Sequence, residues 1–189
     1  MILHGKTVKN STKKSLVVFD MPYKTYTNKF VAYKNARKVM RLTKCDAIKL
    51  EGGKKIVNII KYLTKRKIPV MGHVGLLPQT SINFKVKGKN FIQKKQILED
   101  AIAVDNSGVF AIIIECVVEN LAKIITKNIS VPTIGIGASK YCDGQIPVSY
   151  TLLTLPTSSF FFFFVFGSFS SSFFFFFLFF FFFFFVFFV

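Results

Sequence analysis

Four residues with acid–base or metal-binding side chains each stand at the end of a short apolar run. Asp20 ends SLVVFD, Glu51 ends DAIKLE, His73 ends IPVMGH and Glu115 ends VFAIIIE. In parallel β/α barrels the reactive groups occupy this position, because the strand ends and the loops after them converge on one face. A polar residue can also simply terminate a strand, and a single case would be read in that way. Four cases in successive units, three of them carboxylates, favour an active site.

Two of these residues suit a divalent cation. Asp20 and Glu51 offer carboxylate oxygens, and Mg²⁺ takes one or two carboxylates together with waters and substrate oxygens. Lys49 lies two residues before Glu51, so both side chains point to the same face of the strand. If that face is a barrel interior, Lys49 can bind a substrate carboxylate beside the metal ligand. The alternative is a buried ion pair between Lys49 and Glu51.

The other two residues suit hydrogen bonding and proton transfer. His73 follows Gly72 at a strand end, where its imidazole can donate a hydrogen bond to a substrate or hold a loop, and a purely structural role fits equally well. Glu115 lies between Ile114 and Cys116 in an apolar run, and burial there would raise its pKa toward the range of a general base. The alternative for Glu115 is an ion pair with a nearby lysine.

Short apolar runs alternate with longer helix-like stretches, which is typical of β/α units around a parallel sheet. We predict strands over residues 15–20, 46–51, 68–73, 109–115 and 131–136. Helices are predicted over residues 28–43, 54–65, 94–106 and 118–128, and the long connection 74–91 is expected to be a functional loop. The fold class is therefore α/β, with about five β/α units of an incomplete TIM-type (β/α)₈ barrel.

The composition changes sharply along the chain. Of the 26 Phe residues, 21 follow Ser159, and no charged residue follows Asp143. We therefore divide the chain into a partial barrel domain at 1–148 and an unrelated low-complexity Phe/Ser tail at 149–189. Phe, Ser, Leu and Pro are the residues that pyrimidine-only codons encode, so the tail reads as translated pyrimidine-rich DNA. The alternative interpretation of the tail is a membrane anchor, because 173–189 is an uninterrupted apolar run at the short limit of a spanning helix.

The net charge of +17 raises the question of a nucleic-acid partner. Only Arg37, Arg41 and Arg66 are arginines, whereas nucleic-acid readers rely on Arg for bidentate and stacked contacts. We therefore expect no nucleic acid, and membrane contact only through the tail at 160–189. Three widely spaced cysteines without a C-x-x-C pair and a polar N-terminus without an apolar signal region favour a reducing cytoplasm.

Several motifs resemble the ketopantoate hydroxymethyltransferase family. They occur in the family's order, as VVFDMPY, IKLEGG, IPVMGHVGLLPQT, KVKGK, IIECV, VPTIGIGAS and CDGQ. The resemblance covers about residues 1–148. The segment G-H-x-G-L-x-P-Q together with K-L-E-G-G is highly specific.

The resemblance implies transfer of a hydroxymethyl group from 5,10-methylenetetrahydrofolate to 3-methyl-2-oxobutanoate, which gives 2-dehydropantoate in pantothenate biosynthesis. Asp20 and Glu51 would be Mg²⁺ ligands, Asp20 would also lie near the keto acid, and Lys49 would bind its carboxylate. Glu115 would accept the proton. The family also implies a large homo-oligomer.

The sequence departs from the family pattern at both ends. The family's first two β/α units, with a Gly-Asp-Ser motif that supplies a further Mg²⁺ ligand, have no counterpart here, and neither does its last strand. We therefore expect impaired activity. Two other functions stay open: a related Mg²⁺-dependent lyase or aldolase acting on 2-oxo acids, and a catalytically dead membrane-associated protein.

Overall fold

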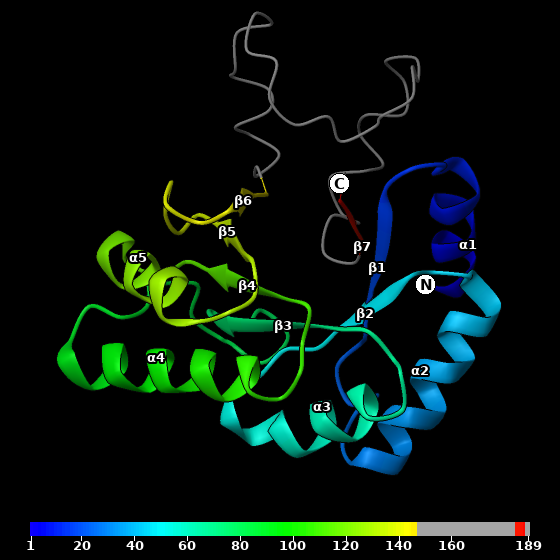
Figure 1. Cartoon of the computed structure of the whole chain (residues 1–189), viewed down its shortest axis with the longest axis horizontal. Helices are drawn as coiled ribbons and strands as arrows, with labels where there is room; N and C mark the ends of the chain where they lie inside the picture. The colour runs from blue at the N-terminus through cyan, green and yellow to red at the C-terminus, as the bar shows by residue number, and fades with distance from the viewer. Residues whose placement is uncertain (147–183, 188–189) are drawn as a thin grey trace, which may run out of the picture.

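Five apolar segments form neighbouring parallel strands, in the order in which they occur along the chain (Figure 1). The computed structural model describes residues 1–146 and 184–187. These strands are β1 (Leu16–Asp20), β2 (Ala47–Lys49), β3 (Val70–Gly75), β4 (Ala111–Glu115) and β5 (Thr133–Ile136). Each pairs in parallel with the next, and Asp20 lies beside Lys49 across the first pair. The prediction of parallel neighbours in chain order is confirmed.

Two further strands extend the sheet beyond the predicted five. The short β6 (Gly144–Gln145) adds a sixth parallel strand beside β5. At the other end β7 (Phe184–Phe187) pairs antiparallel with β1. The parallel strands thus form a curled, open α/β sheet without a reversal of order, consistent with part of a TIM-type barrel (Figure 1).

The helices that connect the strands lie along one face of this sheet (Figure 1). They are α2 (Lys29–Thr43), η1 (Lys54–Ile56) leading into α3 (Val57–Thr64), α4 (Phe91–Asp105) and α5 (Glu119–Asn128). Asn28 and Asn90 cap α2 and α4, because their side-chain oxygens accept hydrogen bonds from backbone N–H groups of the first turn. The Asn90 cap starts α4 three residues before the predicted 94, and the predicted helix 54–65 begins as a 3₁₀ turn instead.

The two faces of the sheet bury different sets of residues, as the two-residue period of a strand requires. Val17 and Phe19 belong to the larger core cluster, together with the helices, whereas Val18 belongs to a second cluster on the opposite face. The second cluster also contains Ala47, Met71, Ala111, Ile113 and Ile134. Asp20 and Lys49 each stand two residues after a member of this second cluster, so their side chains lie on the face away from the helices.

One helix was not predicted. Helix α1 (Ile2–Ser11) has little amphipathic character, and no acidic residue stands in its first turn. Tertiary contacts hold it instead: Gly5 is buried, and a Cβ placed there would come within 2.9 Å of Thr43 and 3.2 Å of Phe19. Lys9 also forms an ion pair with Asp46 at 2.7 Å. Close packing on α2 and β1 therefore stabilises a helix that its own sequence pattern does not signal.

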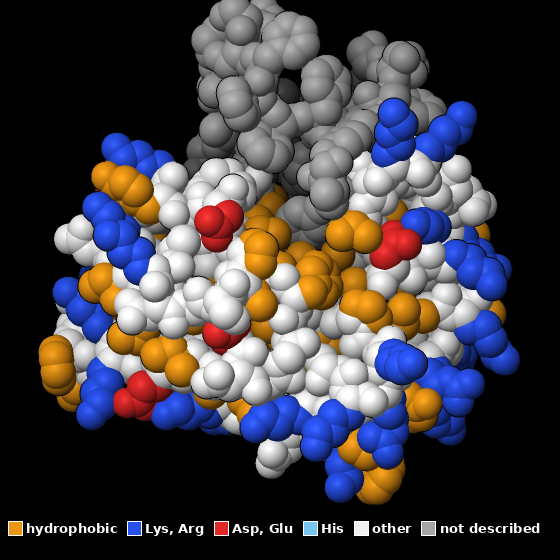
Figure 2. All heavy atoms as spheres, viewed as in Figure 1, with side chains coloured by type: hydrophobic (Ala, Val, Ile, Leu, Met, Phe, Trp, Pro, Cys, Tyr) orange, Lys and Arg blue, Asp and Glu red, His pale blue; other side chains and the backbone are white. Residues whose placement is uncertain are grey.

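The surface and the tail bear on the predicted partners. On the face seen in Figure 2, Lys and Arg side chains are spread around the periphery and do not gather into one patch. The predicted boundary between 148 and 149 lies outside the described residues, and so does the tail apart from β7. Within the described part of the chain, no helix is long and apolar enough to span a membrane.

Candidate active site

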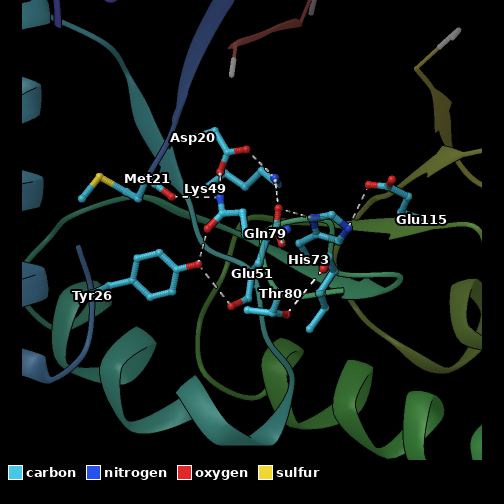
Figure 3. A network of polar contacts seen from close by, with 10 residues as sticks. Asp20, Met21, Tyr26, Lys49, Glu51, His73, Gln79, Thr80 and Glu115 are labelled. Atoms are coloured by element: carbon cyan, nitrogen blue, oxygen red, sulfur yellow. Dashed lines mark hydrogen bonds and ion pairs between the residues drawn. The ribbon is translucent and has the colours of Figure 1, made fainter. Parts of the chain in front are cut away.

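The polar residues predicted from the strand ends come together at one edge of the sheet (Figure 3). Asp20 and Glu115 are the last residues of β1 and β4, and Lys49 is the last residue of β2. Glu51 follows β2 by two residues, and His73 lies within β3, two residues before its end. The carboxyl ends of four adjacent parallel strands therefore supply the whole cluster.

Lys49 joins the two carboxylates that were predicted to share a cation. Its Nζ donates to Asp20 Oδ2 at 2.6 Å and to Glu51 Oε1 at 3.1 Å, and all three side chains are at most 3% exposed. Burial raises the pKa of Asp20 from its usual value, and the Lys49 ammonium opposes this rise. The ion pair between Lys49 and Glu51, left open by the sequence, is present and includes Asp20.

His73 lies between the carboxylates of two neighbouring strands. It is fully buried, with Nδ1 3.7 Å from Glu51 Oε1 and Nε2 3.3 Å from Glu115 Oε2. Burial lowers the pKa of His73 to about 3, and the nearby Lys49 ammonium lowers it further, so the imidazole is neutral. Among the described residues neither ring nitrogen meets a partner in hydrogen-bond geometry. A neutral ring has one N–H, so it can donate to only one of the two carboxylates.

Glu115 combines burial with access to the outside of the cluster. Its side chain is 14% exposed, and burial raises its pKa to about 7 against the lowering effect of Lys49. Within the described chain its carboxylate lies 3.3 Å from the neutral His73 ring and forms no ion pair with a lysine. A carboxylate with this pKa can accept a proton at neutral pH.

Two residues of this network were not identified from the sequence. Gln79, in the connection between β3 and α4, bonds Asp20 and Glu51, and the buried Tyr26 bonds Gln79 (Figure 3). Both stand in segments that resemble the family motifs or lie close to one, since Gln79 belongs to IPVMGHVGLLPQT and Tyr26 follows VVFDMPY. Membership of the motif was the signal by which Gln79 could have been found, but the motif by itself gives no role to this residue.

The donor chemistry of the cluster fits a hard divalent cation. Asp20 and Glu51 each place a carboxylate oxygen within hydrogen-bond distance of Lys49 Nζ, and Mg²⁺ in proteins uses one or two carboxylates besides waters and substrate. The described residues contain no group of three or more His, Cys, Asp or Glu side chains placed to hold a metal. These two carboxylates are therefore the ligands that this part of the chain can offer, and their roles stay a prediction.

Comparisons with known proteins agree with the motif order. The profile of the family described as Ketopantoate hydroxymethyltransferase matches residues 1–168. A 3-methyl-2-oxobutanoate hydroxymethyltransferase of Pelagibacter ubique (strain HTCC1062) is 57% identical over 155 residues, which cover 82% of this chain and 60% of the relative. A protein of the same name from Phenylobacterium zucineum (strain HLK1) is 48% identical over 159 residues, 82% of this chain and 58% of the relative. The chain thus spans about 60% of the length of the curated relatives it matches.

Proposed function

Because the chain belongs to the ketopantoate hydroxymethyltransferase family, we propose that it carries the enolate-forming part of that enzyme's active site. The reaction is hydroxymethyl transfer from 5,10-methylenetetrahydrofolate to 3-methyl-2-oxobutanoate, a step of pantothenate biosynthesis. The observation that carries the proposal is the convergence of Asp20, Lys49, Glu51 and Glu115 at one sheet edge, with Glu115 holding a pKa of about 7. The name of the relatives contains the same keto acid.

Each residue has a separate role in this proposal. Lys49 binds the carboxylate of the keto acid with its ammonium, and Asp20 and Glu51 hold Mg²⁺. When bound there, Mg²⁺ supplies positive charge that favours the enolate of the keto acid. Glu115 accepts the proton from the carbon beside the carbonyl, and the C–H electron pair moves into the enolate. His73 stays neutral, and its ring nitrogens have no hydrogen-bond partner among the described residues, so an N–H of the ring can donate to the keto acid.

The remaining chemistry is carbon–carbon bond formation. The methylene carbon of the donor is bound to two nitrogens, and both carbon–nitrogen bonds break: the enolate carbon replaces one nitrogen and the oxygen of water replaces the other. The two nitrogens take up the proton removed from the keto acid and one proton of the water. The chain's contribution is to form the enolate and to keep it oriented, since buried, fixed charges act more strongly than they would in water.

We further propose that the six parallel strands belong to a (β/α)₈ barrel in the whole protein. The strand order follows the chain without reversal, and the outer edge of β6 has no partner strand within residues 1–146 and 184–187. A closed barrel would pair this edge and enclose the face on which Asp20 and Lys49 lie.

Proton exchange at the keto acid tests the proposal without requiring the folate donor. The 3-methyl-2-oxobutanoate C3–H signal is followed by proton NMR in D₂O with Mg²⁺, for this chain and for a chimera completed with the remaining segments of the Pelagibacter relative. We expect Mg²⁺-dependent exchange in the chimera, loss of at least about 10² in rate for Glu115→Gln, and no change for the exposed control Glu119→Gln.

The same samples separate the neighbouring functions. Transfer of labelled carbon from 5,10-methylenetetrahydrofolate into product supports the hydroxymethyltransferase. Exchange without transfer from this donor would favour a related lyase or aldolase. No exchange by the chimera, or normal exchange in its Glu115→Gln form, would refute the proposed role of the cluster.

A further inference from the structure

The side chain of Gln79 uses all of its polar atoms inside the carboxylate cluster (Figure 3). Its Nε2 donates to Asp20 Oδ1 at 3.3 Å and to the Met21 carbonyl oxygen at 3.0 Å. Its Oε1 accepts a hydrogen bond from the Tyr26 hydroxyl at 3.0 Å, and its backbone N–H donates to Glu51 Oε2 at 3.1 Å. One residue of the connection between β3 and α4 therefore contacts both carboxylates.

Gln79 and Lys49 divide the carboxylate oxygens between them. Lys49 bonds Asp20 Oδ2 and Glu51 Oε1, whereas Gln79 bonds the other oxygen of each carboxylate. The terminal torsion of a carboxylate is soft, so a partner on each oxygen is what holds its plane. Gln79 provides this restraint as a neutral donor, which adds no positive charge to compete with a cation.

Tyr26 and the Met21 carbonyl fix the direction in which the Gln79 amide points. A hydroxyl that donates to Oε1 and a carbonyl that accepts from Nε2 are both satisfied in one orientation of the amide only. In that orientation the NH₂ group faces Asp20. Tyr26 is buried, and its hydroxyl is also 3.5 Å from the Glu51 carbonyl oxygen, which keeps the ring in place.

We propose that Gln79 is a positioning residue that holds Asp20 and Glu51 in the arrangement required for divalent-cation binding, with Tyr26 acting through it. This inference rests on the proposed function, because it assumes that the two carboxylates bind the cation. It makes the connection 76–90 part of the cation site, although that segment contributes no ligand.

Cation affinity is the readout that distinguishes positioning from a purely structural role. Mn²⁺, which also accepts octahedral oxygen ligands, is titrated into the full chain and free Mn²⁺ is followed by EPR. Gln79→Met removes the side-chain amide and its bond to Asp20 but keeps the backbone N–H bond to Glu51. It should weaken binding about tenfold, the value of one hydrogen bond to a charged group. Tyr26→Phe should weaken it about threefold, and the double variant should match Gln79→Met alone, since Tyr26 acts through Gln79.

The matched control is Thr80→Ala in the same segment. Among residues 1–146 and 184–187 the Thr80 hydroxyl bonds the nearby Leu77 carbonyl oxygen and no group of the cluster, so Mn²⁺ affinity should stay within about twofold of the unmodified chain. Thermal unfolding of every variant is measured in parallel. Tyr26→Phe deletes one oxygen only, and it keeps the test valid if Gln79→Met fails to fold.

Each outcome has one meaning. Equal Mn²⁺ affinity in the unmodified chain and in folded Gln79→Met or Tyr26→Phe overturns the inference and leaves the proposed function standing. A lower unfolding temperature without a change in affinity also overturns it, because Gln79 would then be structural. No Mn²⁺ binding by the unmodified chain counts against the proposed cation site, and the inference falls with it.

Discussion

Replacing Lys49 by Met removes the one ammonium that joins Asp20 and Glu51. Lys49 Nζ lies 2.6 Å from Asp20 Oδ2 and 3.1 Å from Glu51 Oε1, and the three side chains are at most 3% exposed. Methionine fills most of the same volume without a charge. The variant therefore keeps the packing and leaves two buried carboxylates without their cation.

The expected cost follows from that burial. Removing one partner of a buried ion pair typically costs about 3–5 kcal/mol, because the remaining charge is uncompensated. Asp20 already has a raised pKa, so it will take up a proton in the variant and relieve part of the cost. We expect a loss of about 3 kcal/mol at pH 7.5. A carboxyl whose pKa is raised in the fold contributes its full stabilisation below its unfolded pKa, and this contribution disappears as pH rises through the folded pKa. The stability difference between Lys49→Met and the unmodified chain should therefore be less than half as large at pH 5 as at pH 7.5.

Urea denaturation at the two pH values, with and without Mg²⁺, measures these effects. The control is Lys9→Met, which breaks the ion pair with Asp46, where the side chains are 24% and 31% exposed. That pair should contribute less than about 1 kcal/mol. In Lys49→Met the two carboxylates match a divalent cation, so Mg²⁺ at about 100 times its dissociation constant should restore about 2.7 kcal/mol.

The comparison of Lys49→Met with Lys9→Met distinguishes a loss of charge in the buried cluster from a general effect of replacing a lysine. Equal losses in the two variants, independent of pH, would refute the view that charge at Lys49 stabilises the cluster. A large, pH-dependent loss in Lys49→Met that Mg²⁺ does not reduce would support the ion pair and refute the two carboxylates as cation ligands.

Three further predictions concern single residues of the cluster and the core. Glu115 must be ionised to accept a proton, so the exchange rate of the completed chimera should rise about tenfold per pH unit below the Glu115 pKa of about 7 and level off above it. An exchange rate that stays constant between pH 5 and pH 8 would contradict the role of Glu115 as the base. His73 stays neutral in the fold, but in the unfolded chain it takes up a proton below its usual pKa of 6.5, so the fold loses stability as pH falls. Between pH 7.5 and pH 5 the unmodified chain should therefore lose about 2 kcal/mol more than His73→Gln in urea titrations, and parallel pH curves of the two proteins would contradict this. Gly72→Ala would place a Cβ 2.4 Å from Val104 Cγ1 and should destabilise the fold by about 1–3 kcal/mol in the same assay, whereas unchanged stability would mean that α4 can shift away from β3.

The strand-end residues could be located from the sequence because two local rules act together. Apolar runs of strand length fix where each strand lies, and the two-residue period then fixes the face of every side chain in it. Lys49 and Glu51 were placed on one face for this reason, and the close approach of Lys49 to Asp20 follows from the parallel pairing of β1 and β2.

Other parts depend on contacts that no local pattern encodes. Gln79 meets Asp20 across 59 positions of sequence, through a connection whose path the flanking strand and helix do not determine. Helix α1 forms although its pattern is weak, because Gly5 allows close packing on Thr43 and Phe19. For His73 the sequence left two readings open, and its place between two carboxylates depends on the relative positions of three strands.

The parallel strands β1 to β6 lie in the sheet in chain order, which has a consequence for the time course of folding. During synthesis, at about 5–20 residues per second, each of the strands β2 to β6 finds its partner in the strand made just before it. Contacts between sequence neighbours carry a small loop-closure cost and form early. Asp20 and Lys49 can therefore meet on the nascent chain before Glu115 has been synthesised. The buried charges of Asp20 and Lys49 thus neutralise each other first, and Glu115, whose pKa is raised to about 7, joins an edge where this ion pair already exists.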